Sequence, residues 1–276
     1  MIAWLGDVAS AWFWWVVICG FLLAIAAETV IPARQSGLPA WRWTDHLALY
    51  AACLILAGLI QPRTYVLALM PNHDTTLFGF VGRVGGETAV LISGLLLLDL
   101  FVYFLHWLQH VVFVLWRFHA VHHSDVDMDA STSMRHHPFA YLLTAVCVGV
   151  LFAVFGLPAW VFPIYGVILF LAALFQHLNV RLPAWLEGPL GLVLICPNMH
   201  RLHHSMNPDD YNYNFGNVLS IWDRLFGTLR IPTAWEEDRI VFGLDGQPDK
   251  LPHFWTWKMP FLLSRPSLRE QVTTQR

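Results

Sequence analysis

Histidines are the residues in this sequence whose spacing could support chemistry. Of the 14 histidines, 11 lie between His106 and His204. One HxxxH pair and two HxxHH groups within this stretch contain His106, His110, His119, His122, His123, His200, His203 and His204. Residues three and four apart share one face of a helix, so each group can direct its imidazoles toward one point. The concentration of histidines therefore predicts a metal site.

The number of imidazoles suggests two ions. A zinc site takes three or four protein ligands, so eight histidines are too many for one ion and suit two. Imidazole binds Zn, Cu, Fe and Ni. The groups lack the glutamate of HExxH and ExxH motifs, which disfavours a zinc peptidase and a carboxylate-rich di-iron bundle. A pair of imidazole-bound redox metals could use dioxygen to attack an unactivated C–H bond.

Composition predicts an integral membrane protein. The chain is 57% hydrophobic and 13% charged, whereas soluble domains are nearer a quarter charged. The net charge of -3 gives no sign of nucleic-acid binding. The four cysteines lie in apolar stretches without a CxxC motif, so no thiolate zinc site is indicated. The first apolar run lacks a basic start and is long enough to span a bilayer, which argues against a cleavable signal peptide.

Apolar runs indicate the membrane helices. They cover residues 11–31, 47–69, 88–116 and 139–175, with a Pro/Gly-rich loop at 71–86 and a hairpin break near Gly156. The run 88–116 is expected to be one helix that carries His106 and His110 to the lipid boundary. We expect an all-α polytopic membrane helical bundle of about four to five membrane helices. It would form one domain over residues 1–276, with a catalytic core at about 88–230.

Basic residues predict the orientation. If the N-terminus lies outside, five crossings place the loop with Arg34 and Arg42 on the same side as the histidines. Most later arginines fall on that side, and only Arg63 and Arg83 fall on the other. Because basic residues favour the cytoplasmic side, the histidine-rich cap is expected to face the cytoplasm.

Four segments carry a resemblance to a known family. HWLQH, HAVHH, PNMHRLHH and YNYNFGNVLSIWDRLFGT, in this order, resemble the fatty acid hydroxylase/sterol desaturase superfamily of membrane histidine-box di-iron oxygenases. The resemblance runs from about Asp99 to Thr228. It implies O2-dependent hydroxylation or desaturation of a lipid substrate, such as a sterol, fatty acyl or sphingoid chain, at two iron ions. It also implies a separate electron donor: a cytochrome b5, a ferredoxin or a similar reductase chain.

The same resemblance implies the ligands. They would be the eight histidines named above, joined by His177 and His137. His177 could instead cap its helix, His137 could be a ligand or an outer-shell donor, and His136 is expected at the surface. Trp107 replaces the arginine that several members have in the first box, and Phe139-Ala140 follows RHHP where a glutamate often stands two residues beyond the proline. These departures leave the substrate open.

Outer-shell residues are expected around the ligands. The candidates are Asp99, Tyr103, Asn198, Asn214 and Asp223. Asp99 lies two helical turns before His106 in an apolar run, where an ionisable residue is costly and is a functional candidate by default. We expect its carboxylate to accept a hydrogen bond from a metal-bound imidazole. Alternatively, it pairs with a polar group on another helix, and Asp223 could simply cap a helix.

Other functions remain open at this stage. A non-catalytic membrane metal-binding protein, such as a transporter or a b-haem electron carrier, is the main alternative. A transporter should hold its ligands near the bilayer midplane, and a haem needs only two axial histidines. A zinc hydrolase is a further alternative. Metal analysis and an optical spectrum would distinguish these classes.

Overall fold

The fold is built from helices. A computed structural model describes residues 2–35, 42–69, 75–247 and 255–263. Five long helices form the body: α1 (Trp4–Val30), α2 (Arg42–Leu69), α3 (Leu77–Val111), α5 (Pro138–Phe155) and α6 (Val161–His177). Their apolar residues recur all round the helix, which is typical of segments that face lipid on one side and a packed interior on the other.

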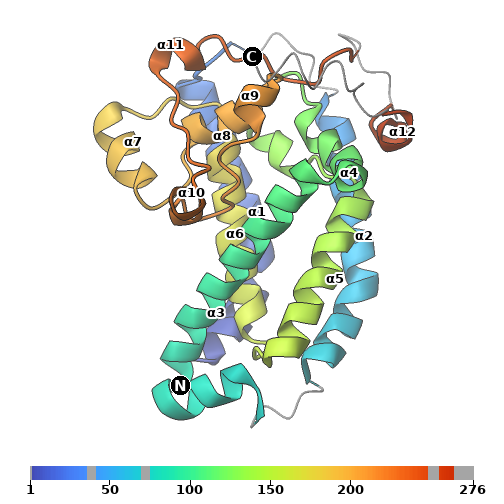
Figure 1. The fold of residues 1–276 in the computed structure, drawn as a ribbon, viewed down its shortest axis with the longest axis vertical. Helices are drawn as coiled ribbons and strands as arrows, with labels where there is room; N and C mark the ends of the chain where they lie inside the picture. Colours follow the sequence, from blue (N-terminus) through green and yellow to red (C-terminus); the bar gives the residue numbers. More distant parts are fainter. Residues whose placement is uncertain (1, 36–41, 70–74, 248–254, 264–276) are drawn as a thin grey trace.

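The long helices confirm the membrane bundle predicted from composition. Four of them, α1, α2 up to Ile60, α3 and α5, are long and apolar enough to cross a bilayer, and α6 is apolar but shorter. They run alternately up and down in Figure 1, so that α1, α3 and α6 end at the same end of the bundle. The chain is a multi-pass membrane protein with an all-α fold.

A core of aliphatic and aromatic residues joins α3, α5 and α6. Leu98 from α3, Phe152 from α5 and Val161 from α6 are buried there. Gly94 allows the close approach of α3, because a Cβ at this position would lie 2.8 Å from a methyl carbon of Leu157. The hairpin break expected near Gly156 is present: this residue ends α5 in the left-handed conformation, with φ +67°.

The third helix differs from its prediction at both ends. It begins at Leu77, where the Thr76 side chain accepts a hydrogen bond from the Gly79 amide, so much of the expected loop is helical. Residues 71–74 of that loop lie outside the described residues. Gly86, with φ +68°, kinks the helix. The helix also ends at Val111, because Val112 is extended, and a separate helix, α4 (Phe113–His123), follows.

The break at Val112 matters for the site because it lets α4 fold back against α3. Shorter elements complete a cap at this end of the bundle, as Figure 1 shows. They are η2 (Ala130–Met134), α7 (Ala184–Gly191), α8 (Pro197–His203), α9 (Pro208–Tyr211), α10 (Ile221–Phe226), α11 (Ala234–Glu237) and α12 (Trp255–Leu262).

Candidate metal centre

Nine imidazoles converge at the cap end of the bundle in two groups. The first group contains His106, His110, His119, His123 and His203. The second contains His122, His177, His200 and His204. Within each group the potential ligand atoms lie within 4.8 Å of one another. Among the residues that the structure describes, neither group includes a carboxylate or a thiol.

Each HxxHH segment serves both groups. On α4, His119 and His123 lie one turn apart and join the first group, while His122 joins the second. The segment on α8 has the reverse assignment, since its i, i+4 pair joins the second group and His203 joins the first. The expectation that one segment would aim at one point was therefore wrong. Residues at i and i+3 are separated by about 60° around a helix, enough to reach two neighbouring sites.

Backbone carbonyls fix the ring orientation of three imidazoles. The Nδ1 atoms of His106, His177 and His203 lie 2.7–2.8 Å from the carbonyl oxygens of Phe215, Ala173 and Tyr213, respectively. A carbonyl only accepts hydrogen bonds, so each Nδ1 carries the proton and each Nε2 presents a lone pair.

Those lone pairs face one another. The Nε2 atoms of His106 and His203 are 3.0 Å apart, and the carbonyl contacts make both of them acceptors. Two acceptors at this distance repel each other unless a cation lies between or beside them. In the second group, the Nε2 of His177 lies 3.2 Å from that of His122 and 3.1 Å from that of His200. The donor set therefore fits bound metal ions.

Burial supports the same conclusion. Both ring nitrogens of His110 and one nitrogen each of His122, His123, His200 and His204 are buried without a hydrogen-bond partner in the described part of the chain. Burial, reinforced by neighbouring imidazoles, lowers the pKa of His122, His123 and His204 well below the usual 6.5. These rings are neutral at physiological pH, which is the form that binds a metal. The rings of His123 and His204 stack at 4.4 Å, so the two groups adjoin.

Two of the outer-shell candidates, Asp223 and Tyr103, hold the loop that orients His106. The buried carboxylate of Asp223 accepts hydrogen bonds from the amides of Phe215 and Gly216, both at 2.8 Å, and from the Thr228 hydroxyl. The Tyr103 hydroxyl lies 2.8 Å from the same Thr228 hydroxyl. Burial raises the pKa of Asp223 to about 6, although these donors favour its charged form.

Asn214 and Asn198 make different contacts. Asn214 has a positive φ of 59°, and its amide group donates to the carbonyls of Met199 and Arg230, which fastens the same loop to α8. Asn198 accepts a hydrogen bond from the Met199 amide within α8. Asn214 thus joins the loop to α8, whereas the hydrogen bond of Asn198 stays within its own helix.

Asp99 has a different role from the expected one. Its carboxylate accepts hydrogen bonds from Trp222 Nε1 at 2.8 Å, the Leu219 amide at 3.1 Å and the Tyr165 hydroxyl at 3.3 Å. Leu219 lies in the loop before α10, Trp222 in α10 and Tyr165 in α6, so Asp99 joins α3 to these segments and not to an imidazole. The alternative of a polar partner on another segment is the one observed.

Two neighbouring histidines differ from their expectations. His136 is half-buried and not an open surface residue, because its ring stacks at 4.5 Å on that of His122. His137 belongs to neither group. Its Nδ1 accepts a hydrogen bond from the Phe139 amide, so it caps α5.

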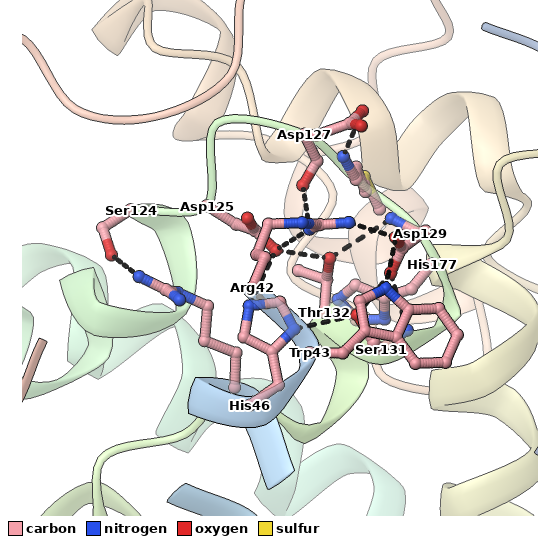
Figure 2. A network of polar contacts seen from close by, with 12 residues as sticks. Arg42, Trp43, His46, Ser124, Asp125, Asp127, Asp129, Ser131, Thr132 and His177 are labelled. Atoms are coloured by element: carbon pink, nitrogen blue, oxygen red, sulfur yellow. Dashed lines mark hydrogen bonds and ion pairs between the residues drawn. The ribbon is translucent and has the colours of Figure 1, made fainter. Parts of the chain in front are cut away.

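A buried polar network that we did not predict supports α4 and η2 (Figure 2). Arg42 of α2 donates to Asp125 at 2.7 Å and also binds Asp129. Burial opposes the ionisation of Asp125, but neighbouring positive charges outweigh it and lower its pKa to about 2. Arg135 donates to the Val121 carbonyl and the Ser124 hydroxyl, on either side of the adjacent ligands of α4. In the sequence, the available signal for this network was the pair Asp125 and Asp129, four residues apart in a chain with few charged residues.

A second buried ion pair holds α8. Arg201, between two histidines of the segment, is 1% exposed and binds Glu237 of α11 at 2.5 Å. It also donates to the carbonyls of Leu178 and Val180, just beyond His177. Arg201 thereby ties α8 to the end of α6, which brings together ligands of the second group.

The order and geometry of these segments agree with a comparison to known families. A sequence profile of the fatty acid hydroxylase family matches residues 91–228, half of the 276-residue chain. The chain belongs to the fatty acid hydroxylase family. The matched part of this hydroxylase-family chain contains all nine converging histidines, whereas Arg42 and Glu237 lie outside it.

Several curated relatives are similar to this family member. An ornithine lipid hydroxylase from Rhizobium tropici is 35% identical over 51% of this chain and 42% of its own length. The alkylglycerol monooxygenase of Homo sapiens is 31% identical over 55% of this chain and 32% of its own length. A very-long-chain aldehyde decarbonylase from Oryza sativa subsp. japonica is 25% identical over 76% of this chain and 34% of its own length. The match thus spans less than half of each relative. No solved structure matches the chain.

Proposed function

We propose that this protein hydroxylates an alkyl chain of a membrane lipid, using O2 and a di-iron centre held by the nine converging histidines. Desaturation of the same chain is the second possible outcome. The observation that carries the proposal is the pair of imidazole groups whose lone pairs face one another without an intervening donor.

The donor set supports redox chemistry over hydrolysis. Imidazole suits iron, and dioxygen chemistry needs a redox metal. Hydrolysis by zinc would use a nearby carboxylate as general base, and none belongs to either group among the described residues. When bound, two iron ions would supply the activation of O2, with one oxygen atom entering the product and the other leaving as water after addition of two electrons and two protons.

The chain's own residues would perform three tasks. The nine imidazoles would hold the two ions, five in the first group and four in the second. The carbonyls of Phe215, Ala173 and Tyr213 keep the protons of their partner rings on Nδ1, so that Nε2 is free to bind. Eight of the nine histidines are buried, with relative exposure of 6% or less, and His110 is half-buried, so the cap keeps bulk water from the reacting atoms.

We infer the substrate class, the electron source and the orientation from supporting features. The long apolar helices give the site access to lipid, and the curated relatives include enzymes named for ornithine lipid and alkylglycerol. Electrons would come from a separate donor, such as a cytochrome b5, a ferredoxin or a similar reductase chain. Arg34, Arg42, Arg135 and Arg201 contact segments of the cap that carries the histidines, which favours a cytoplasmic site.

Metal analysis tests the proposal first. Protein purified in detergent should contain about two iron ions per chain, as two imidazole groups require, and no Soret band. His122→Ala should lose the metal of the second group. His137→Asn is the matched control, since asparagine also caps a helix and His137 lies outside both groups. Zinc as the bound metal, or a single ion per chain, would contradict the proposal.

Lipid analysis tests the reaction. Membranes containing the wild-type protein should accumulate a lipid heavier by one oxygen atom, or lighter by two hydrogen atoms for desaturation. The product should be absent with His122→Ala and present with His137→Asn. An unchanged lipid profile with iron-loaded protein and a working electron donor would reject the oxygenase function.

A further inference from the structure

A pair of stacked aromatic rings joins the first group of histidines to the surface of the cap. The ring centroids of Trp116, on α4, and Tyr211, on α9, lie 5.2 Å apart, with the ring planes at 18°. Trp116 also lies 5.0 Å from the ring of His110 and 5.3 Å from that of His123. Both members of the pair are half-buried. Ring contacts therefore run without a break from the surface to two of the proposed ligands.

The pair lies where the histidines are least covered. His110 is the half-buried member of the nine, and Tyr211 lies 5.9 Å from its ring, ring centre to ring centre. Phe215 also has a ring contact with His110, but it is 2% exposed and does not reach the surface. In the described ranges, the rings of the second group contact only other histidines. Trp116 and Tyr211 thus provide the aromatic route from the surface into this centre.

The surface around Tyr211 faces water. Its neighbours Asn207, Asp209 and Asn212 are exposed and polar. The short helix α9 lies in the upper part of the cap in Figure 1, away from the body of the bundle. Arg230 holds α9 in place, because its guanidinium donates to the Asp209 carbonyl at 3.1 Å. A water-soluble protein domain can therefore reach the outer edge of this ring pair.

Stacked rings of this kind suit electron transfer. Electron tunnelling weakens steeply as the gap between π systems widens, and ring contacts keep each gap short. Aliphatic side chains would instead place saturated carbon in the path. The proposed reaction consumes two electrons, which a separate donor must deliver to buried ions. The stack of His123 on His204, at 4.4 Å, would continue the route from the first group to the second.

We propose that the electrons enter through Tyr211 and Trp116 from a one-electron carrier protein that docks on α9. The assignment rests on the proposed function and deepens it. Each transfer oxidises the reduced carrier by one electron and reduces one ferric ion to the ferrous state, while both rings keep their bonds and protons. Two transfers supply the electrons that the reaction needs. Tyr211 and Trp116 are electron-transfer residues, and neither holds an ion.

A photoreducing label tests the route without lipid or O2. The full-length, iron-loaded protein in nanodiscs would carry Asn212→Cys, next to Tyr211. The exposed Cys19 and the half-buried Cys147 are changed to serine, so that the new thiol is the target. A ruthenium polypyridine complex on this thiol, excited by a flash, takes an electron from an excess amine and passes it to the protein. Bleaching of the ferric absorption should show a fast phase.

Removal of either ring should abolish this fast phase. Tyr211→Leu and Trp116→Leu each open a gap in the route, whereas Tyr211→Phe keeps the stacked ring and should keep the fast phase. Trp235→Leu is the matched control, because Trp235 is 64% exposed on α11 and has no ring contact with a described histidine. Iron content should be equal in all these variants, since none of the changed side chains belongs to either group.

A second label site separates electron transfer from a structural role. Gly188→Cys places the label on α7, where an added Cβ has nothing within 4 Å. Reduction from this label does not use the ring pair, so it should be slower and should be unchanged by Tyr211→Leu. A fast phase from the Asn212→Cys label that survives both leucine variants would overturn the proposal. Equal slowing from both labels would also overturn it, because this pattern indicates a disturbed metal centre.

The two proposals can fail separately. Normal lipid oxidation by Tyr211→Leu with a working electron donor would reject the route and leave the oxygenase intact. A fast phase that Tyr211→Leu abolishes, in a wild-type protein that forms no oxidised lipid, would support the route and reject the oxygenase. If Trp116→Leu failed to fold, the comparison of Tyr211→Leu with Tyr211→Phe would still decide, because these two variants differ in the stacked ring.

Discussion

Replacing Arg42 with methionine should destabilise this protein strongly, although Arg42 contacts no proposed ligand. Arg42 is 7% exposed, and its guanidinium binds Asp125 and Asp129, which are also buried. Methionine keeps much of the side-chain volume but leaves two buried carboxylates without their cation. Breaking a buried ion pair in this way costs about 3–5 kcal/mol.

The pKa of Asp125 supports this magnitude. Its value of about 2, against 3.8 in the absence of partners, means that its surroundings favour the ionised form by about 2 kcal/mol. Arg42 supplies part of this preference and binds Asp129 as well, so the loss combines the contributions of two carboxylates. At roughly 2–4 °C per kcal/mol for a chain of this size, the Tm should fall by about 10 °C.

Thermal unfolding in detergent, followed by tryptophan fluorescence, would measure the change. Arg181→Met is the matched control: its ion pair with Asp238 is largely exposed and should contribute less than about 1 kcal/mol. Adding Asp125→Asn to Arg42→Met should recover part of the loss, because it removes one of the stranded charges. Equal Tm values for the Arg42 and Arg181 variants would refute the reasoning.

The other predictions concern the metal centre. Asp223→Asn should weaken binding of the first-group ion about tenfold or more, as expected for a residue that supports a ligand. Asp223→Asn should change the Tm little, because loss of a buried charge offsets the lost hydrogen bond. A metal titration of this variant, with Asp210→Asn as the control variant, would measure the change in affinity. His203→Ala and His200→Ala should each lose one ion, from different groups, and a variant that loses both ions would contradict the assignment. Metal-free protein should lose stability as the pH falls below about 6.5, because the unfolded chain takes up protons that the buried imidazoles, with lowered pKa values, cannot. A Tm of the chelated protein that stays constant from pH 7 to pH 5, a range that brackets the histidine pKa, would argue against neutral rings.

The histidines could be found from the sequence because helix periodicity is a local property. Spacings of three and four residues already place His119, His122 and His123 near one another. Their division between two groups could not be found, since it depends on which side of α4 faces α3. That orientation follows from the break at Val112, where two adjacent valines gave little indication that the helix would end.

Long-range polar pairs also could not be predicted from the sequence. Arg42 and Asp125 are separated by 83 residues, and nothing in either segment identifies the other as its partner. Asp99 was assigned to His106 from a spacing along one helix. Its donors instead lie in the loop before α10 and in α10 itself, about 120 residues away, and in α6. Identifying such partners requires the packing of the whole bundle.

The reversed use of the two HxxHH segments has a consequence for how the ions are spaced. Because the HxxHH segments of α4 and α8 each contribute to both groups, the distance between the two proposed ions would be set by helical pitch and not by loops. A one-residue insertion between His119 and His122 would rotate the later ligands by about 100° and misdirect both sites together. Loops around this centre can therefore change in length, while these two short helices must keep their register for either ion to bind.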